Sequence, residues 1–224
     1  MEKEGIREMN KYTLGTIIGT ALLGLAKAKK GGRNSYKPRK IESIYKLPKS
    51  KKAQITELDL SRMGLTQIPD DIFDGFTNLE KLNLGYNQLI ELPESIGNLT
   101  NLEELGLDKN QLTELPESIG NLTNLKWLWL PENQLTELPQ SIGNLTNLTQ
   151  LVVSFNELTE LPEAIGNLTN LEILWLDNNP WKKPVPKETI LKMIRNRVHK
   201  DVINSIIDMN NSIPTKSKSN LRLR

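Results

Sequence analysis

The sequence contains no cysteine and only one histidine, His199. Without cysteine there is no disulfide framework, no thiolate nucleophile and no cysteine-based metal site. A Ser-His-Asp arrangement would have to use His199, and no catalytic motif surrounds that residue. Metal-ligand spacings and glycine-rich phosphate loops are also lacking. The sequence therefore predicts no catalytic residue, no metal site and no cofactor, and the protein is not expected to be an enzyme.

Long apolar runs are scarce near the N-terminus, where the uncharged stretch at residues 12–26 is shorter than the roughly 20 residues that span a bilayer. Three interpretations of this stretch stay open. It is a membrane-surface helix, a helix packed on the end of the folded domain, or the core of a signal peptide. Lysines that follow the stretch and glutamates that precede it argue against the signal peptide.

Charge of one sign is scarce in each part of the chain, so each part has a strong charge excess even though the whole carries a net charge of only +2. Residues 1–53 have 14 Lys and Arg against 4 Asp and Glu, residues 54–180 have 4 against 20, and residues 181–224 have 11 against 3. The acidic middle repels phosphate, so nucleic acid is not an expected partner. The basic residues after the apolar stretch predict binding to an anionic membrane through residues 12–52.

A repeat dominates what is present. Leucines recur at a spacing of 23 residues within a phrase that reads almost unchanged as NLEELGLDKNQLTELPESIGNLT, and they stand at Leu79, Leu102, Leu125, Leu148 and Leu171. Self-similarity at a fixed period is the signature of a stacked solenoid. In the unit that starts at Leu102, we expect a short strand at 104–107, and we expect these apolar residues in the core: Leu102, Leu105, Leu107, Leu112, Leu115, Ile119 and Leu122.

Asparagine, proline and glycine recur at fixed places in each unit. An amide both donates and accepts, so we expect a ladder that satisfies backbone groups, formed by Asn87, Asn110, Asn133, Asn156 and Asn179. Met63 takes this place in the first repeat. Pro69, Pro93, Pro116, Pro139 and Pro162 are expected to fix a bend. The glycines at 97, 120, 143 and 166 are expected to have a positive φ or to permit close approach.

These units fit the pattern L-x-x-L-x-L-x-x-N-x-L and resemble the leucine-rich repeat family over roughly residues 55–180. The LPxxIGxLxxL segments resemble the subtype found in intracellular Ras-group proteins, Ras-pathway scaffolds and many bacterial proteins. The resemblance implies an α/β solenoid, a leucine-rich repeat horseshoe with a parallel sheet on its concave side. It also implies a protein-interaction module.

Four regions follow from this pattern. Residues 1–53 hold the apolar segment and a basic linker that is largely outside the core, and residues 54–180 form the repeat domain. Residues 181–208 form a C-terminal cap, because apolar residues at helical spacing over 187–208 can cover the end of a solenoid. Residues 209–224 are expected to be a disordered basic tail.

The concave face is expected to carry the binding site. Alternate strand residues face opposite sides of a sheet, so the third and fifth places of each unit face away from the core. In the last three units these places and the nearby eighth place hold apolar residues, including three of the four tryptophans: Trp127, Trp129, Val152, Phe155, Ile173 and Trp175. Exposed aromatic surface of this kind marks an interaction site.

The favoured interpretation is therefore a non-catalytic scaffold or adaptor that binds a protein partner of unknown identity, with no small-molecule substrate. Three other uses of the aromatic surface remain open: coverage by the chain itself, contact between two copies, and a small-molecule site. The alternative function is a membrane-tethered or exported binding protein. We expect a cytoplasmic location, with membrane association through the N-terminal segment, and export is the alternative.

Overall fold

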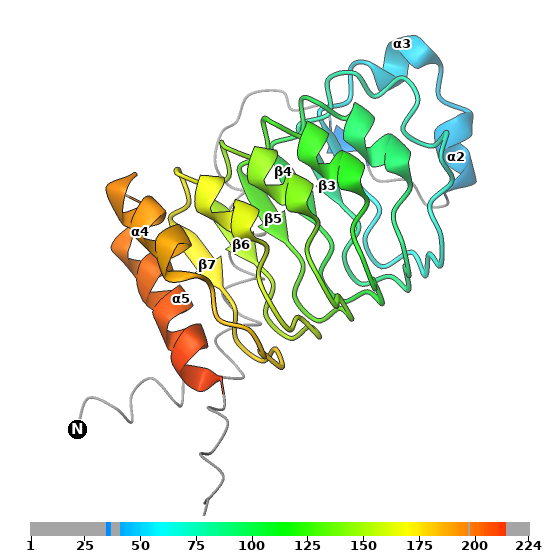
Figure 1. The fold of residues 1–224 in the computed structure, drawn as a ribbon. Helices are drawn as coiled ribbons and strands as arrows, with labels where there is room; N and C mark the ends of the chain where they lie inside the picture. The colour runs from blue at the N-terminus through cyan, green and yellow to red at the C-terminus, as the bar shows by residue number, and fades with distance from the viewer. Residues whose placement is uncertain (1–34, 37–40, 197, 214–224) are drawn as a thin grey trace, which may run out of the picture. The chain divides into compact units, whose positions relative to one another are not determined.

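A single parallel sheet runs through the computed structural model, which describes residues 35–36, 41–196 and 198–213. The strands pair in the order in which they occur in the chain (Figure 1). They are β1 (Ser35–Tyr36), β2 (Glu57–Asp59), β3 (Lys81–Asn83), β4 (Glu104–Gly106), β5 (Trp127–Trp129), β6 (Gln150–Val152) and β7 (Ile173–Trp175). The predicted solenoid is confirmed, and the strand expected at 104–107 is one residue shorter.

The opposite side of each unit is a short 3-10 helix. These helices are η1 (Glu94–Asn98), η2 (Glu117–Asn121), η3 (Gln140–Asn144) and η4 (Glu163–Asn167). Each starts directly after a proline whose φ lies between −64° and −70°. The fixed proline φ sets the direction in which the chain enters the helix, as the sequence predicted. Figure 1 shows these helices on one side of the array and the strands on the other.

Leucine and isoleucine fill the space between the two sides. Leu102, Leu105, Leu107 and Leu112 are fully buried, as are Ile119 and Leu122, and Leu115 is 5% exposed. All belong to one continuous core that extends along the array. The core positions predicted for this unit are therefore confirmed.

The asparagine ladder is confirmed in atomic detail. The side-chain nitrogen of Asn110 donates to the carbonyl oxygens of Leu107 and Leu84, both at 3.1 Å, while its Oδ1 accepts from the backbone N–H of Leu89 at 3.1 Å. Asn133 and Asn156 repeat this pattern. Each amide thus joins two units at a buried turn, where unpaired backbone groups would be costly.

Of the two roles expected for the repeated glycines, the structure shows close approach and not a positive φ. Positive φ among the described glycines occurs at Gly64 and Gly75 instead. A Cβ atom at Gly97 would lie 2.6 Å from the carbonyl oxygen of Ser118, and one at Gly120 would lie 2.6 Å from Ser141. Stacked 3-10 helices leave no room for a side chain there.

The N-terminal end of the array is capped by part of the segment expected to be a solvated linker. Helices α2 (Glu42–Tyr45) and α3 (Lys49–Lys52) pack against the first repeat, with Ile44 fully buried in the core. Lys52 is only 6% exposed, and its Nζ lies 5.3 Å from the ring centre of Phe76. Burial of its aliphatic stem explains how a lysine-rich stretch covers apolar residues. The expected linker is thus wrong for residues 42–52.

The C-terminal cap consists of two helices, α4 (Lys187–Arg195) and α5 (Lys200–Ser212), where one helix was expected over 187–208. The backbone of His199 is extended, with ψ of 135°, and its side chain accepts from the N–H of Asp201, which starts α5 anew. Helix α5 also continues four residues beyond the predicted cap. Buried side chains join both helices to the core: Met193, Val198, Val202, Ile206 and Met209.

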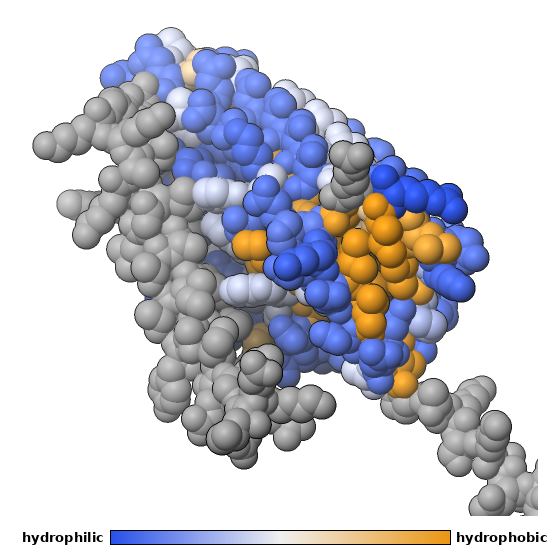
Figure 2. All heavy atoms as spheres, turned by 90° about the vertical axis from the view of Figure 1, so that its left-hand side faces the viewer, coloured by the Kyte–Doolittle hydropathy of each residue, from blue (hydrophilic) through white to orange (hydrophobic). Residues whose placement is uncertain are grey.

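The outer surface of this cap remains partly apolar. Leu191 and Ile194 on α4 and Ile207 on α5 are 37%, 50% and 40% exposed. Figure 2, which faces this end of the array, shows apolar side chains gathered there. No helix among the described residues is long and apolar enough to cross a membrane. The apolar stretch at 12–26 lies outside the described residues.

Candidate protein-binding face

The strand register places the predicted site residues in two rows on the concave face, by which we mean the sheet face opposite the core. In the first row, Trp127 of β5 lies between Glu104 and Gln150, and Ile173 of β7 follows Gln150. In the second row, Trp129, Val152 and Trp175 are consecutive partners in β5, β6 and β7. Neighbouring strands are about 4.8 Å apart, so these side chains are neighbours across the sheet.

Two tryptophans from one strand form the centre of this face. The ring centres of Trp127 and Trp129 are 5.6 Å apart and the rings are inclined at 41°. This separation lies within the range for attractive aromatic pairs. Neither tryptophan belongs to the continuous leucine core, even though Leu128 between them is fully buried in it. The alternation expected for a strand is therefore present in β5.

The expected exposure was wrong for two residues. Trp129 is 7% exposed and Val152 only 2%, whereas Trp127, Ile173 and Trp175 are partly exposed. The physical reason lies in the second row, where Val152 has a tryptophan on each side. Large side chains on adjacent strands cover a small one between them. Trp129 and Val152 thus form the floor of the face, and the partly exposed residues form its accessible surface.

Phe155 lies at the turn that follows β6 and is 37% exposed. Its φ is 57°, and a positive φ between 54° and 59° recurs at the same place of each unit, at Arg62, Tyr86, Lys109, Glu132, Phe155 and Asn178. Such a backbone is uncommon for residues other than glycine. The backbone N–H of Phe155 donates to the carbonyl oxygen of Asp177 at 2.9 Å, so the next unit fixes this turn. This row of left-handed residues was not predicted from the sequence, because different residue types occupy it.

The concave face of the first repeats carries charges that pair with one another. Lys81 of β3 forms an ion pair with Glu104 of β4, and its Nζ also lies 5.9 Å from the ring centre of Trp127. Along the turn row, the guanidinium of Arg62 lies 3.7 Å from the ring centre of Tyr86, and the ammonium of Lys109 lies 4.9 Å from it. The cationic side chains here are therefore paired with a carboxylate or with an aromatic ring.

The pKa values of two neighbouring side chains at these turns, Asp108 and Lys109, are shifted. Burial raises the pKa of the Asp108 carboxyl, which is 4% exposed, although its own backbone N–H and Lys109 act in the opposite direction. Burial lowers the pKa of Lys109, but the nearby Glu132 and Tyr86 outweigh it, so the net shift is upward. Glu132 lies 3.4 Å from the Lys109 ammonium.

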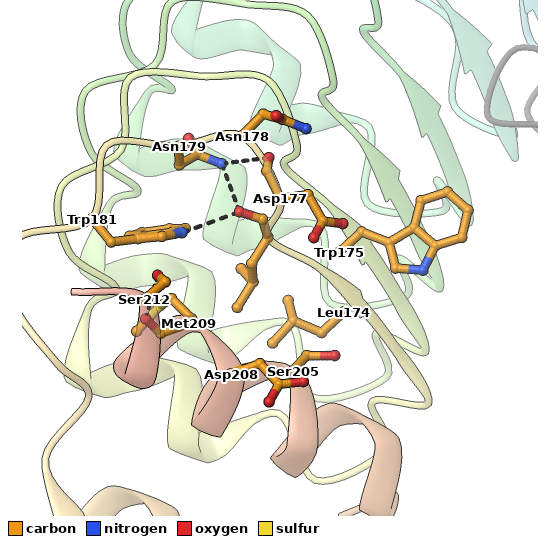
Figure 3. A pocket seen from close by; sticks show the side chains of 11 residues that line it. Leu174, Trp175, Asp177, Asn178, Asn179, Trp181, Ser205, Asp208, Met209 and Ser212 are labelled. Carbon is orange, nitrogen blue, oxygen red and sulfur yellow. Dashed lines mark hydrogen bonds between the residues drawn. The ribbon is translucent and has the colours of Figure 1, made fainter. Parts of the chain in front are cut away.

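A pocket of about 370 Å³ adjoins the aromatic rows at their C-terminal end. Trp175 of β7 forms part of its wall, the turn after β7 contributes Asp177, and α5 contributes Asp208 and Ser205 (Figure 3). This pocket was not predicted from the sequence, because its two carboxylates are far apart in the chain and share no motif. In the described part of the chain, no three His, Cys, Asp or Glu residues come together in a way that could hold a metal ion.

Comparison with known proteins identifies the repeats. Residues 104–196 match a family model described as a leucine-rich repeat region, and residues 53–112 match one described as a leucine rich repeat. Together these matches cover the array and α4. Neither match distinguishes the LPxxIGxLxxL subtype. No curated protein matches the chain.

Several solved structures share the fold. A leucine-rich repeat protein of Leptospira interrogans is 34% identical with a TM-score of 0.52, over 70% of this chain and 45% of that one. The plant peptide hormone receptor RGFR1 in complex with RGF2 is 39% identical with a TM-score of 0.57, over 66% and 24% of the two chains. The Drosophila Toll–Spatzle complex is 34% identical with a TM-score of 0.56, over 62% and 19%. This chain thus spans less than half of each of these neighbours.

Proposed function

The chain belongs to the leucine-rich repeat proteins, and we propose from this premise that it is a non-catalytic module, a scaffold or adaptor, which binds a protein partner on its concave face. The single observation that carries the proposal is the aromatic half of that face. Its three tryptophans lie in β5 and β7, on either side of β6, and are outside the continuous core, and Trp127 and Trp175 are partly accessible. Tryptophan is among the residues most enriched at interface hot spots.

Two of the similar structures support this proposal. One neighbour is a receptor in complex with a peptide hormone, and another is a complex of Toll with Spatzle. Repeat solenoids of this kind use an extended concave surface for binding. The site residues proposed for the partner are Trp127, Trp129, Val152, Phe155, Ile173 and Trp175. Trp129 and Val152 support the accessible residues from below.

The proposal is tested by capture of the partner with a double variant, Trp127→Ala/Trp175→Ala. Both side chains lie outside the core, so the variant should melt within a few degrees of the wild-type protein. Loss of hot-spot aromatics should weaken binding by about 2 kcal/mol or more, which is roughly thirtyfold in Kd. The control is Ile90→Ala, because Ile90 is a large apolar residue that is 53% exposed and lies outside the two rows. Equal capture by both variants would refute the concave site.

A membrane-tethered form of the same module is proposed because of the charge pattern near the N-terminus. Residues 12–26 supply apolar area, and the residues after them supply positive charge. Each basic residue near an anionic surface is worth about 1 kcal/mol. The full-length protein should co-sediment with phosphatidylserine vesicles, more weakly at high salt, and a chain that starts at Asn34, which lacks the apolar stretch, should co-sediment much less. Equal sedimentation of the two chains would leave a free module, which is cytoplasmic or exported.

A further inference from the structure

The pocket beside Trp175 offers a more specific partner chemistry. Resting on the concave-face function proposed above, we propose that this pocket binds the arginine or lysine side chain of a peptide segment of the partner protein. The pocket volume of about 370 Å³ is near the lower end of the range for ligand sites. It has room for one long side chain and excludes a folded element.

Two of the side-chain donors that line the pocket, those of Asn179 and Trp181, are already used within the protein. The side-chain nitrogen of Asn179 donates to the carbonyl oxygens of Leu176 at 3.0 Å and Asp177 at 3.3 Å. The indole nitrogen of Trp181 donates to the same Leu176 oxygen at 3.1 Å. Figure 3 shows these bonds directed into the turn after β7. Neither group is free to bind an anion.

The two serine hydroxyl groups of α5 that line the pocket also donate hydrogen bonds within the protein. Ser205 Oγ donates to the carbonyl oxygen of Asp201 at 2.8 Å, and Ser212 Oγ donates to that of Met209 at 2.7 Å. Because each hydroxyl proton is used along the helix, only oxygen lone pairs remain for a ligand. The serines can therefore accept hydrogen bonds from a guanidinium or ammonium group.

Two carboxylates add negative charge from opposite sides of the pocket. Asp177 follows β7, and Asp208 belongs to α5. Within the described residues, neither carboxylate has a Lys or Arg partner among the ion pairs of the structure. The carbonyl oxygen of Asp177 accepts from Phe155 N–H at 2.9 Å, so its backbone is held in place. A ligand with several N–H donors and a positive charge complements this arrangement.

Trp175 connects the pocket with the concave face. It lines the pocket and is also the last residue of the row that contains Trp129 and Val152. In Figure 3 Trp175 and Trp181 lie on opposite sides of Asp177. A cation near the Trp175 ring would gain a cation–π contact. A partner segment that lies on the aromatic rows thus brings its next side chain to the carboxylates. The repeat array has 20 Asp and Glu against 4 Lys and Arg over residues 54–180, and this negative charge favours a basic partner segment.

The test uses full-length protein with ¹⁵N-labelled tryptophan, titrated with acetyl-arginine amide, acetyl-lysine amide and acetyl-glutamine amide. The indole signal of Trp175, assigned from Trp175→Phe, should shift with the two cationic amides and not with the neutral one. Asp177→Asn/Asp208→Asn should raise the Kd of acetyl-arginine amide about fivefold, as expected for two exposed charge pairs. The matched control is Asp201→Asn, since Asp201 lies on the same helix, has a 67% exposed side chain and does not line the pocket.

Two results would overturn the inference: equal shifts with the arginine and glutamine amides, or unchanged affinity in Asp177→Asn/Asp208→Asn. Partner capture separates the inference from the function on which it rests. Trp127 does not line the pocket, so capture lost in Trp127→Ala and retained in Asp177→Asn/Asp208→Asn refutes the cation pocket and keeps the concave site. Capture insensitive to Trp127→Ala, with intact binding of the amides, refutes the concave site instead.

Discussion

The first and last halves of the concave face have the same backbone and opposite chemistry. Strands β2 to β4 and β5 to β7 pair in the same register, and each has a leucine at its centre that belongs to the core. The polar half pairs its own charges, as between Lys81 and Glu104. The aromatic half presents the partly exposed side chains of Trp127 and Trp175. The scaffold therefore leaves the outward places free to differ, and the proposed binding site lies in the aromatic half.

Removal of the C-terminal cap should have the largest effect on stability, and it should destabilise the aromatic half before the polar half. A chain truncated after Lys183 loses Met193, Val202, Ile206 and Met209, which are all buried. At about 1.5–3 kcal/mol for each buried side chain, the loss is at least about 6 kcal/mol. Because repeats are stabilised mainly by their neighbours, β7 and β6 should open first and β3 last.

Hydrogen exchange followed by mass spectrometry measures this order directly. Early loss of protection in the peptides that contain β6 and β7, with β3 still protected, is the expected result. Uniform loss of protection along the array would mean that it unfolds as one unit. Unchanged protection in all strands would show that α4 and α5 do not act as a cap.

Substitution of a core leucine should have the next largest effect on stability. The loss in the free energy of unfolding should be equal in the two halves. Leu105 of the polar half and Leu128 of the aromatic half are both fully buried at the centre of their strands. Leu→Ala at either place should lower the free energy of unfolding by about 2–5 kcal/mol. Urea denaturation of the two variants tests this equality. A much smaller loss for Leu128→Ala would show that the tryptophans beside it also support the fold.

Trp129→Ala should have a smaller effect than Leu128→Ala. Trp129 is 7% exposed but lies outside the continuous core, and it contacts Trp127 across 5.6 Å. Loss of one aromatic contact and of part of its burial should lower the free energy of unfolding by about 1–2 kcal/mol. Thermal melting of Trp127→Ala beside it provides the comparison, since that residue is more exposed and should lose less. A loss equal to that of Leu128→Ala would place Trp129 in the core.

The scaffold could be predicted from the sequence because the same residue types recur at the same places in successive repeats. Leucine at the place of Leu102 and asparagine at the place of Asn110 recur in every unit after the first, so one unit explains the others. Helical spacing over residues 187–208 also predicted a C-terminal cap, but the N-terminal cap could not be predicted. Residues 42–52 read as a basic linker, and the burial of Ile44 and Lys52 depends on an array end that no local pattern reveals.

The site was predicted only in part. Alternation along β5 to β7 indicated which residues leave the core, and the register bears out the two rows. The exposed fraction of each residue could not be read from the sequence, because Val152 is covered by tryptophans of two other strands. The pocket carboxylates Asp177 and Asp208 were missed because the packing of α5 on β7 brings them together.

The smallest expected effect concerns pH and separates the two halves once more. Asp108 follows β4 in the polar half, whereas the same place after β6 holds the neutral Ser154. Burial raises the pKa of the Asp108 carboxyl in the folded protein. In the unfolded chain an aspartate ionises near its ordinary value of about 3.9. Between these two pKa values the unfolded chain binds fewer protons than the folded protein, so stability falls as pH rises through this window.

Asp108→Asn removes this loss while it keeps the size of the side chain. Below about pH 3.9 both forms of Asp108 are protonated, so the variant and the wild-type protein should have similar stability there. As pH rises through the raised pKa of Asp108, the variant should become the more stable of the two, and the difference should then level off. Urea denaturation between pH 3 and pH 8 measures both curves. Parallel curves over the whole range would show that the Asp108 carboxyl titrates alike in the folded and unfolded chain, and the polar half would then be as insensitive to pH at this place as the aromatic half.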